Sequence, residues 1–180
     1  MKIAANSPSS SPENDRAVRF EIANRLFFRL YQASNLLHKT GSRSVAEFGS
    51  TTQQWAVLGA LSRPAVRARG MTVKELIEFL LLSRQNLTAV LNRLERQGMV
   101  ERTRIVEDGR VRRIRLTERG TEIWARMLVN IGAYYESTLD GFTTEETQLL
   151  YRLLDRLKTR LQTLSSEPAS GTTFRFLSPQ

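Results

Sequence analysis

A polar run between residues 83 and 93 carries side chains whose chemistry matches the edges of DNA bases. Arginine donates two hydrogen bonds to guanine, glutamine and asparagine bond adenine, and threonine contacts a base or the thymine methyl. No acidic residue occurs from Ser83 to Asn92, although protein surfaces usually mix charges of both signs. The solvated face of an ordinary amphipathic helix is the alternative interpretation. The predicted DNA contacts in this run are Ser83, Arg84, Gln85, Asn86, Thr88, Asn92 and Arg93.

A second group of cations follows within fourteen residues and consists of Arg102, Arg104, Arg110, Arg112, Arg113 and Arg115. The alternating runs 99–105 and 111–116 are separated by an Asp-Gly pair, which predicts a β-hairpin. Arg110 stands just after the turn, where it can enter a minor groove, and we expect Asp108 to hold this or a neighbouring arginine. Both residues, with Arg112, complete the predicted DNA contacts. The alternative is a strand edge protected by charge.

The sequence predicts two short helices, the second of which carries the polar run at 83–93. The sequence TVKE at 72–75 is a capping box and predicts a helix that begins at Thr72. Ser83 is a suitable N-cap for a second helix that ends at Gly98. The apolar stripe of this second helix has the spacing of one helical face and consists of Leu87, Val90, Leu91 and Leu94. A helix pair followed by a hairpin predicts a winged helix-turn-helix, whose second helix enters the major groove.

Longer helices are predicted on both sides of this unit. Apolar spacing predicts a first helix from about Asp15, with Gly41 as its stop and 41–50 as a loop. The predicted fold class is mostly α with a small β-hairpin wing, a winged helix-turn-helix with N- and C-terminal dimerization helices. The predicted organisation is a flexible arm (1–14), an N-terminal dimerization helix and loop (15–50), a DNA-binding region (51–116), C-terminal dimerization helices (117–165) and a tail (166–180).

The composition favours an anionic partner and removes several chemistries. The 180 residues include 27 Lys and Arg against 18 Asp and Glu, a net charge of +9, and 23 of the cations are arginine. This excess suits DNA, although RNA or an anionic membrane would suit it as well. There is no cysteine and one histidine, which excludes a thiolate zinc site, a His-rich metal site and a thiol redox switch.

No enzyme, cofactor or membrane attachment is indicated. The sequence has no nucleophile–base pair, no glycine-rich phosphate loop and no paired-carboxylate motif. It also has no apolar run of membrane-spanning length and no signal peptide, so we expect a cytoplasmic location.

Three segments together resemble the MarR family of bacterial winged helix-turn-helix regulators: QWAVLGAL (54–61), MTVKELIEFLLLSRQNLTAVLNRLERQGMVERT (71–103) and EDGRVRRIRLTERG (107–120). The resemblance extends from about Arg19 to Leu164. The family often has Asp-Pro before the wing tip, whereas Val106 and Glu107 stand here.

The resemblance implies a homodimer held by helices 15–40, 117–140 and 143–165. Leucines at seam-like spacing in the last helix agree with this. A repressor is implied, bound to a pseudo-palindromic double-stranded DNA operator with half-sites ~10 bp apart. A small aromatic ligand, such as an aromatic or phenolic acid or its CoA thioester, would release the DNA. The alternative is a ligand-independent architectural or antisilencing DNA-binding protein.

The resemblance also implies a ligand cleft between the winged region and the dimerization helices. The candidate ligand contacts are Phe27, Tyr31, His38, Arg43, Trp55, Met127 and Tyr134. Each also has a structural interpretation, since Trp55 fits the core and His38 near a helix C-terminus can interact with the helix dipole. Without cysteine the peroxide-sensing branch of the family is excluded, and without a His, Cys and carboxylate cluster a metal-sensing role is disfavoured.

Overall fold

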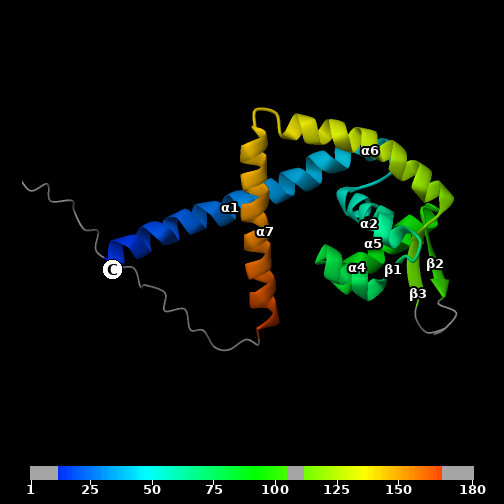
Figure 1. The fold of residues 1–180 in the computed structure, drawn as a ribbon, viewed down its shortest axis with the longest axis horizontal. Coiled ribbons are helices and arrows are strands. Elements are labelled where there is room, and N and C mark those ends of the chain that lie inside the picture. The colour runs from blue at the N-terminus through cyan, green and yellow to red at the C-terminus, as the bar shows by residue number, and fades with distance from the viewer. Residues whose placement is uncertain (1–11, 105–111, 168–180) are drawn as a thin grey trace, which may run out of the picture. The chain divides into compact units, whose positions relative to one another are not determined.

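The computed structural model describes residues 12–104 and 112–167 and shows a mostly helical chain with one small sheet (Figure 1). Its contacts divide the chain into two units, Met1–Tyr134 and Tyr135–Gln180. The first unit contains a winged helix-turn-helix, so the predicted fold class is confirmed. In the described ranges, no helix is long and apolar enough to cross a membrane.

The elements before the wing are five α-helices, one short strand and a 3-10 helix. They are α1 (Pro12–Ser44), η1 (Ala46–Phe48), α2 (Thr52–Ser62), α3 (Pro64–Arg67), β1 (Met71–Thr72), α4 (Val73–Leu80) and α5 (Arg84–Arg96). The wing strands are β2 (Val100–Arg104) and β3 (Arg112–Leu116), followed by α6 (Glu118–Thr138) and α7 (Thr144–Ser166).

Helix α1 is longer than the sequence predicted, and the prediction that Gly41 stops it was wrong. The helix begins at Pro12 and continues to Ser44. Gly41 is buried inside it, and a Cβ at this position would lie 2.7 Å from Thr52 Cγ2. The glycine is therefore required for the close approach of α2. The segment 41–50, predicted as a loop, contains the last turn of α1 and all of η1.

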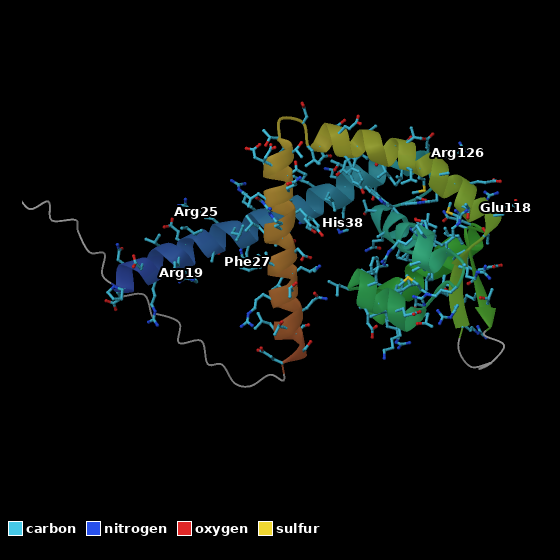
Figure 2. The ribbon with its side chains drawn as sticks, in the orientation of Figure 1. Arg19, Arg25, Phe27, His38, Glu118 and Arg126 are labelled. Atoms are coloured by element: carbon cyan, nitrogen blue, oxygen red, sulfur yellow. The ribbon has the colours of Figure 1, made fainter. Side chains whose placement is uncertain are left out.

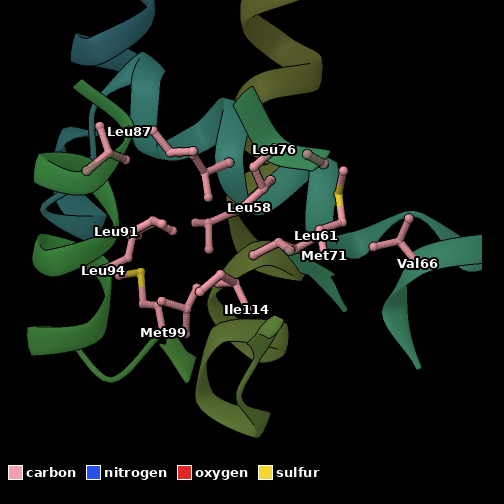
Figure 3. Packing of buried hydrophobic residues seen from close by; sticks show 14 of the residues in the cluster. Leu58, Leu61, Val66, Met71, Leu76, Leu87, Leu91, Leu94, Met99 and Ile114 are labelled. Atoms are coloured by element: carbon pink, nitrogen blue, oxygen red, sulfur yellow. The ribbon is translucent and has the colours of Figure 1, made fainter. Parts of the chain in front are cut away.

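The core of the first unit lies between α2, α4, α5 and the sheet (Figure 3). The predicted stripe of α5 is buried, as Leu87, Leu91 and Leu94 are each at most 1% exposed and Val90 is 7% exposed. Leu58 of α2 packs in the same cluster and is 0% exposed. Burial of these side chains fixes the orientation of α5, because only its opposite face remains in solvent.

The sheet is antiparallel and has the strand order β1-β3-β2. Pairing of Val100 with Leu116 and of Arg104 with Arg112 confirms the predicted hairpin strands, while its turn lies outside the described residues. Strand β1 was not predicted and adds a third strand through the pair Met71 and Ile114. Gly70 has φ 68°, and a Cβ there would lie 2.5 Å from the Ile114 carbonyl oxygen. Only glycine therefore permits this approach.

The last two helices begin where the sequence predicted. Thr143 accepts a hydrogen bond from the Glu146 amide at 3.1 Å, and the Glu146 carboxylate accepts one from the Thr143 amide at 2.8 Å. This is the predicted capping box of α7. None of the α7 residues is buried, and its leucines at 150, 154, 161 and 164 are 42–50% exposed.

Candidate DNA-binding interface

A tight turn joins α4 and α5, and side-chain caps fix where each helix begins. Glu75 and Thr72 form the predicted capping box, with the Thr72 amide donating to Glu75 Oε2 at 2.6 Å and the Glu75 amide donating to Thr72 Oγ1 at 3.1 Å. Ser83 Oγ accepts from the Asn86 amide at 3.2 Å and caps α5. Between the helices Leu81 adopts φ 56°, a left-handed conformation that reverses the chain within a few residues.

The polar face of α5 is exposed opposite its buried stripe. We call it the reading face and define it as Arg84, Gln85, Asn86, Thr88 and Asn92. Arg93, also predicted as a contact, is exposed as well, while Ser83 is engaged as the helix cap. The Thr88 hydroxyl donates to the Arg84 carbonyl at 2.7 Å, so its methyl group and lone pairs remain for a partner. The structure therefore gathers these predicted contacts on one accessible surface.

The wing strand β2 contacts α5 through Arg102, an interaction that the sequence analysis missed. Arg102 Nη2 donates to Asn92 Oδ1 at 2.6 Å. Its Nε lies 3.2 Å from Glu95 Oε2, an ion pair whose geometry falls short of a hydrogen bond. Glu95, an exposed acid in the last turn of α5, is thus paired with an arginine that the sequence placed among the cations of the hairpin.

A second arginine of the hairpin connects the sheet to α4. Arg113 Nη1 lies 3.3 Å from Glu75 Oε2, and Arg69 Nη1 lies 2.8 Å from Glu75 Oε1. Arg113 also donates to the Gly70 carbonyl at 3.2 Å. Burial acts to raise the pKa of Glu75, but hydrogen bonds from Arg69 and Thr72 and the charge of Arg113 outweigh it and lower the pKa to about 2. These contacts hold strand β3 of the wing against the start of α4, and we call this region the base of the wing.

The hairpin arginines whose side chains the structure describes differ in exposure. Arg102 and Arg113 are half-buried and hold structure, Arg115 is half-buried as well, and Arg112 is exposed. Two predicted contacts, Asp108 and Arg110, lie outside the described residues.

The far end of α5 is tied to the start of α2. Gln54 is 1% exposed, and its Nε2 donates to Gln97 Oε1 at 2.8 Å. Gln97 Nε2 donates in turn to the Gly49 carbonyl at 3.0 Å. A satisfied buried amide pair of this kind fixes the relative position of two elements, because a shift would leave a buried donor unpaired.

Three of the candidate ligand contacts meet where α1, α2 and α6 come together, and we call this cluster the junction: His38, Thr40, Thr52, Trp55 and Tyr134. His38 Nδ1 lies 2.8 Å from Thr52 Oγ1, and Thr40 Oγ1 lies 2.9 Å from the Tyr134 hydroxyl. The rings of Trp55 and Tyr134 meet edge to face with centroids 6.1 Å apart. Thr40 and Thr52 were not predicted.

The other four candidates lie elsewhere. Phe27 is on α1, eleven residues before His38 and so ~16 Å along the helix (Figure 2). Tyr31 is 68% exposed and Arg43 is exposed, while Met127 is 0% exposed within the core. In the part of the chain that the structure describes, no three His, Cys, Asp or Glu side chains gather where they could hold a metal ion.

A helix pair with one exposed face, followed by an antiparallel hairpin, defines a winged helix-turn-helix protein. The sequence model of the MarR family matches residues 48–111. The chain is 46% identical over 151 residues to the transcriptional activatory protein BadR of Rhodopseudomonas palustris, covering 81% of this chain and 86% of that protein. The chain belongs to the MarR family and is a transcriptional regulator.

Another relative and two solved structures extend the comparison. The homoprotocatechuate degradative operon repressor of Escherichia coli is 31% identical, over 58% of this chain and 68% of that protein. AbfR of Staphylococcus epidermidis superposes with a TM-score of 0.70 at 26% identity, over 82% of this chain and 98% of that chain. Reduced AbfR bound to DNA gives a TM-score of 0.66 at 27% identity, over 81% and 98% of the two chains.

Proposed function

We propose that this chain is a sequence-specific DNA-binding regulator that inserts α5 into the major groove. The observation that carries the proposal is the reading face, which is exposed, free of acids and held rigidly from behind by the buried stripe. The likeness to AbfR bound to DNA supports it. Arg93 and Arg112, both exposed, are proposed as phosphate contacts, and Arg110 is proposed to enter the adjacent minor groove.

We further propose that two copies bind one operator. Large apolar side chains are exposed along α1, including Phe20 at 71%, Ile22 at 62% and Phe28 at 65%. An apolar surface of this extent is typical of an interface, and the leucines of α7 have the spacing of a helix–helix seam. A symmetric dimer reads a pseudo-palindromic operator with half-sites ~10 bp apart.

A small aromatic ligand is the proposed effector, and the junction is its proposed site. The name of the homoprotocatechuate degradative operon repressor associates one relative with an aromatic acid. The junction combines two aromatic rings with hydroxyl and imidazole groups, which suits an aromatic ring that carries a polar substituent. Oxidation, named for overoxidized AbfR, is not available as a thiol signal here because this sequence has no cysteine.

The proposed sign of regulation is repression, as for the homoprotocatechuate relative. The relative at 46% identity is named an activatory protein and favours the opposite sign. A reporter gene fused to the operator, compared with and without this protein, separates the two: higher expression in its absence supports repression, and lower expression overturns it.

Binding of operator DNA to variants of the reading face tests the DNA-binding proposal. Arg84→Ala or Asn86→Ala should weaken specific binding by about 1–3 kcal/mol and relax base preference at one position. Arg110→Ala should lower the slope of log affinity against log salt by about one unit or less. Arg152→Ala removes an exposed arginine from α7 and serves as the control. If Arg84→Ala and Asn86→Ala both keep the wild-type preference, α5 is not the reader.

Thermal unfolding with a panel of aromatic acids and their CoA thioesters tests the effector proposal. A ligand that binds the folded state raises the melting temperature. The same compound should release operator DNA, and Tyr134→Phe should weaken its effect by removing one hydroxyl from the junction. If no compound in the panel raises the melting temperature or releases DNA, the ligand-independent architectural or antisilencing function is favoured instead.

A further inference from the structure

The contact between Arg102 and Asn92 sets what one residue of the reading face can offer to DNA. Arg102 Nη2 donates to Asn92 Oδ1 at 2.6 Å, and Asn92 is exposed on α5. Arginine carries donors only, so the amide atom that faces it must be the oxygen. The assignment of the Asn92 amide is therefore fixed by chemistry, although oxygen and nitrogen have similar shapes.

The contact with Arg102 leaves the donors of Asn92 available and weakens its oxygen as an acceptor. With Oδ1 held by the guanidinium, the N–H groups of Asn92 Nδ2 remain, and Nδ2 donates to none of the residues that the structure describes. An unconstrained asparagine reads adenine by accepting from N6 and donating to N7 at once. The guanidinium takes one of the two lone pairs of Oδ1 and polarises the amide, so the remaining lone pair is a poorer acceptor for adenine N6 and the Nδ2 N–H groups are better donors. Guanine presents two acceptors, N7 and O6, and fits a side chain that acts mainly as a donor.

Arg102 is itself held in place, which makes the orientation of Asn92 persistent. Its strand is paired to β3, where Arg102 lies opposite Ile114. Its Nε lies 3.2 Å from Glu95 Oε2, and its side chain is only 28% exposed. The guanidinium thus bridges two residues three positions apart on α5, and little side-chain freedom is lost when DNA arrives.

We propose that Arg102 is a positioning residue that makes Asn92 act mainly as a donor to the base, which favours guanine over adenine at one position of each half-site. The inference rests on the proposed DNA-binding function and deepens it. It also revises the sequence-based interpretation, in which an asparagine on this helix was matched to adenine.

Binding to a library of duplexes with one randomised half-site tests the proposal. Wild-type protein should favour guanine over adenine at one position. Arg102→Met keeps the apolar stem but releases Asn92 Oδ1, so the ratio of guanine to adenine at that position should move towards adenine by roughly tenfold. A merely structural arginine would weaken binding to all sequences equally and leave the ratio unchanged.

Two further variants keep the test decisive. Glu95→Gln removes the charge of the ion pair, but the pairing of β2 with β3 and an amide oxygen beside Nε still hold Arg102 against Asn92, so base preference should be unchanged. Asn92→Ala removes one exposed side chain without disturbing the core and should abolish the guanine preference at that position alone, even if Arg102→Met fails to fold.

The outcomes separate the inference from the function on which it rests. If wild-type protein shows no sequence preference at all, the proposed DNA-binding function fails. If wild-type protein is selective but Asn92→Ala keeps every preference, or folded Arg102→Met keeps the wild-type ratio of guanine to adenine, the positioning role of Arg102 is overturned.

Discussion

The winged region and the long terminal helices differ in how their apolar side chains are covered. Every buried apolar side chain of the described residues lies between Val45 and Ile131. In α1 only Gly41 is buried, and in α7 no residue is buried. Yet both helices are rich in large apolar residues, among them Phe20, Phe28 and Tyr31 of α1 and Leu150, Leu154 and Leu161 of α7.

This difference shows that the winged region covers its apolar side chains within one chain, whereas the terminal helices do not. The winged region has a closed core in which leucines from α2, α4 and α5 meet the sheet. Such a core is enough to orient the reading face. The terminal helices leave more apolar surface in water than a stable monomer usually tolerates, so they require a further surface to cover them. A second copy of the chain supplies such a surface by symmetry.

The largest expected effect comes from charges on the seam of α7. Leu154 and Leu161 lie one heptad apart and are 42% and 44% exposed. The double variant Leu154→Glu/Leu161→Glu should separate the dimer at micromolar concentration, because four carboxylates would be forced into one interface. Operator affinity should fall by roughly a hundredfold or more as two linked half-sites become independent. Sedimentation equilibrium and operator titration measure the two effects.

Thr159→Glu adds a carboxylate to an exposed position of α7 away from the seam and is the matched control. It should leave both the dimer and operator binding intact. A double seam variant that still sediments as a dimer would show that α7 does not form the interface.

In the winged region the largest effect is on stability. Leu58 is 0% exposed, and Leu58→Ala should lower the free energy of unfolding by about 2–5 kcal/mol through lost burial and the resulting cavity. Gln53, exposed on the same helix α2, is the control, and Gln53→Ala should change stability by about 0.5 kcal/mol or less. Urea unfolding at one fixed protein concentration measures both, and a small loss for Leu58→Ala would mean that the core is loosely packed.

The sequence predicted those structural features that depend on residues close to one another in the chain. The capping boxes at Thr72 and Thr143, the cap at Ser83 and the stripe of α5 each depend on residues within a few positions of one another. The hairpin was predicted for the same reason, since alternation and a turn dipeptide adjoin one another. Local chemistry therefore placed the reading face correctly on an exposed surface.

Contacts between distant residues could not be predicted in this way. Gly41 has two possible uses, a helix stop or a close approach, and only the neighbouring Thr52 decides between them. Glu75 was predicted as a cap, but its pairing with Arg113 joins residues 38 positions apart. The roles of the hairpin arginines likewise depend on partners in other elements, so the sequence alone did not show that Arg102 and Arg113 hold the wing in place.

A smaller effect is expected at Gly41, where the two regions meet. An alanine Cβ would lie 2.7 Å from Thr52 Cγ2, and Thr52 is also held through Oγ1 by His38 at 2.8 Å. Gly41→Ala should therefore destabilise the protein by about 1–2 kcal/mol, despite the higher helix propensity of alanine.

Gly132 of α6 provides the control, because a Cβ there meets nothing within 4 Å. Gly132→Ala should stabilise the protein by up to about 1 kcal/mol, as expected for a glycine in a helix interior. Thermal unfolding of both variants gives the two signs. If Gly41→Ala is stabilising as well, the approach of α1 to α2 is not tight.

The smallest expected effect concerns acid and the base of the wing. Glu75 has its pKa lowered from 4.5 to about 2, so its carboxylate stabilises the folded state fully above pH 4.5 and loses this contribution as the pH falls towards 2. Its side chain is 33% exposed, and screening by water reduces the expected loss to about 1 kcal/mol.

Urea unfolding of wild type and Glu75→Gln between about pH 5 and about pH 2 should show a steeper decline in the free energy of unfolding for wild type. Glu78→Gln removes an exposed carboxylate 3.9 Å from Lys74 on the same helix and should leave that decline unchanged. Equal slopes for wild type and Glu75→Gln would mean that the wing is held by its strand pairing and core, without help from this carboxylate.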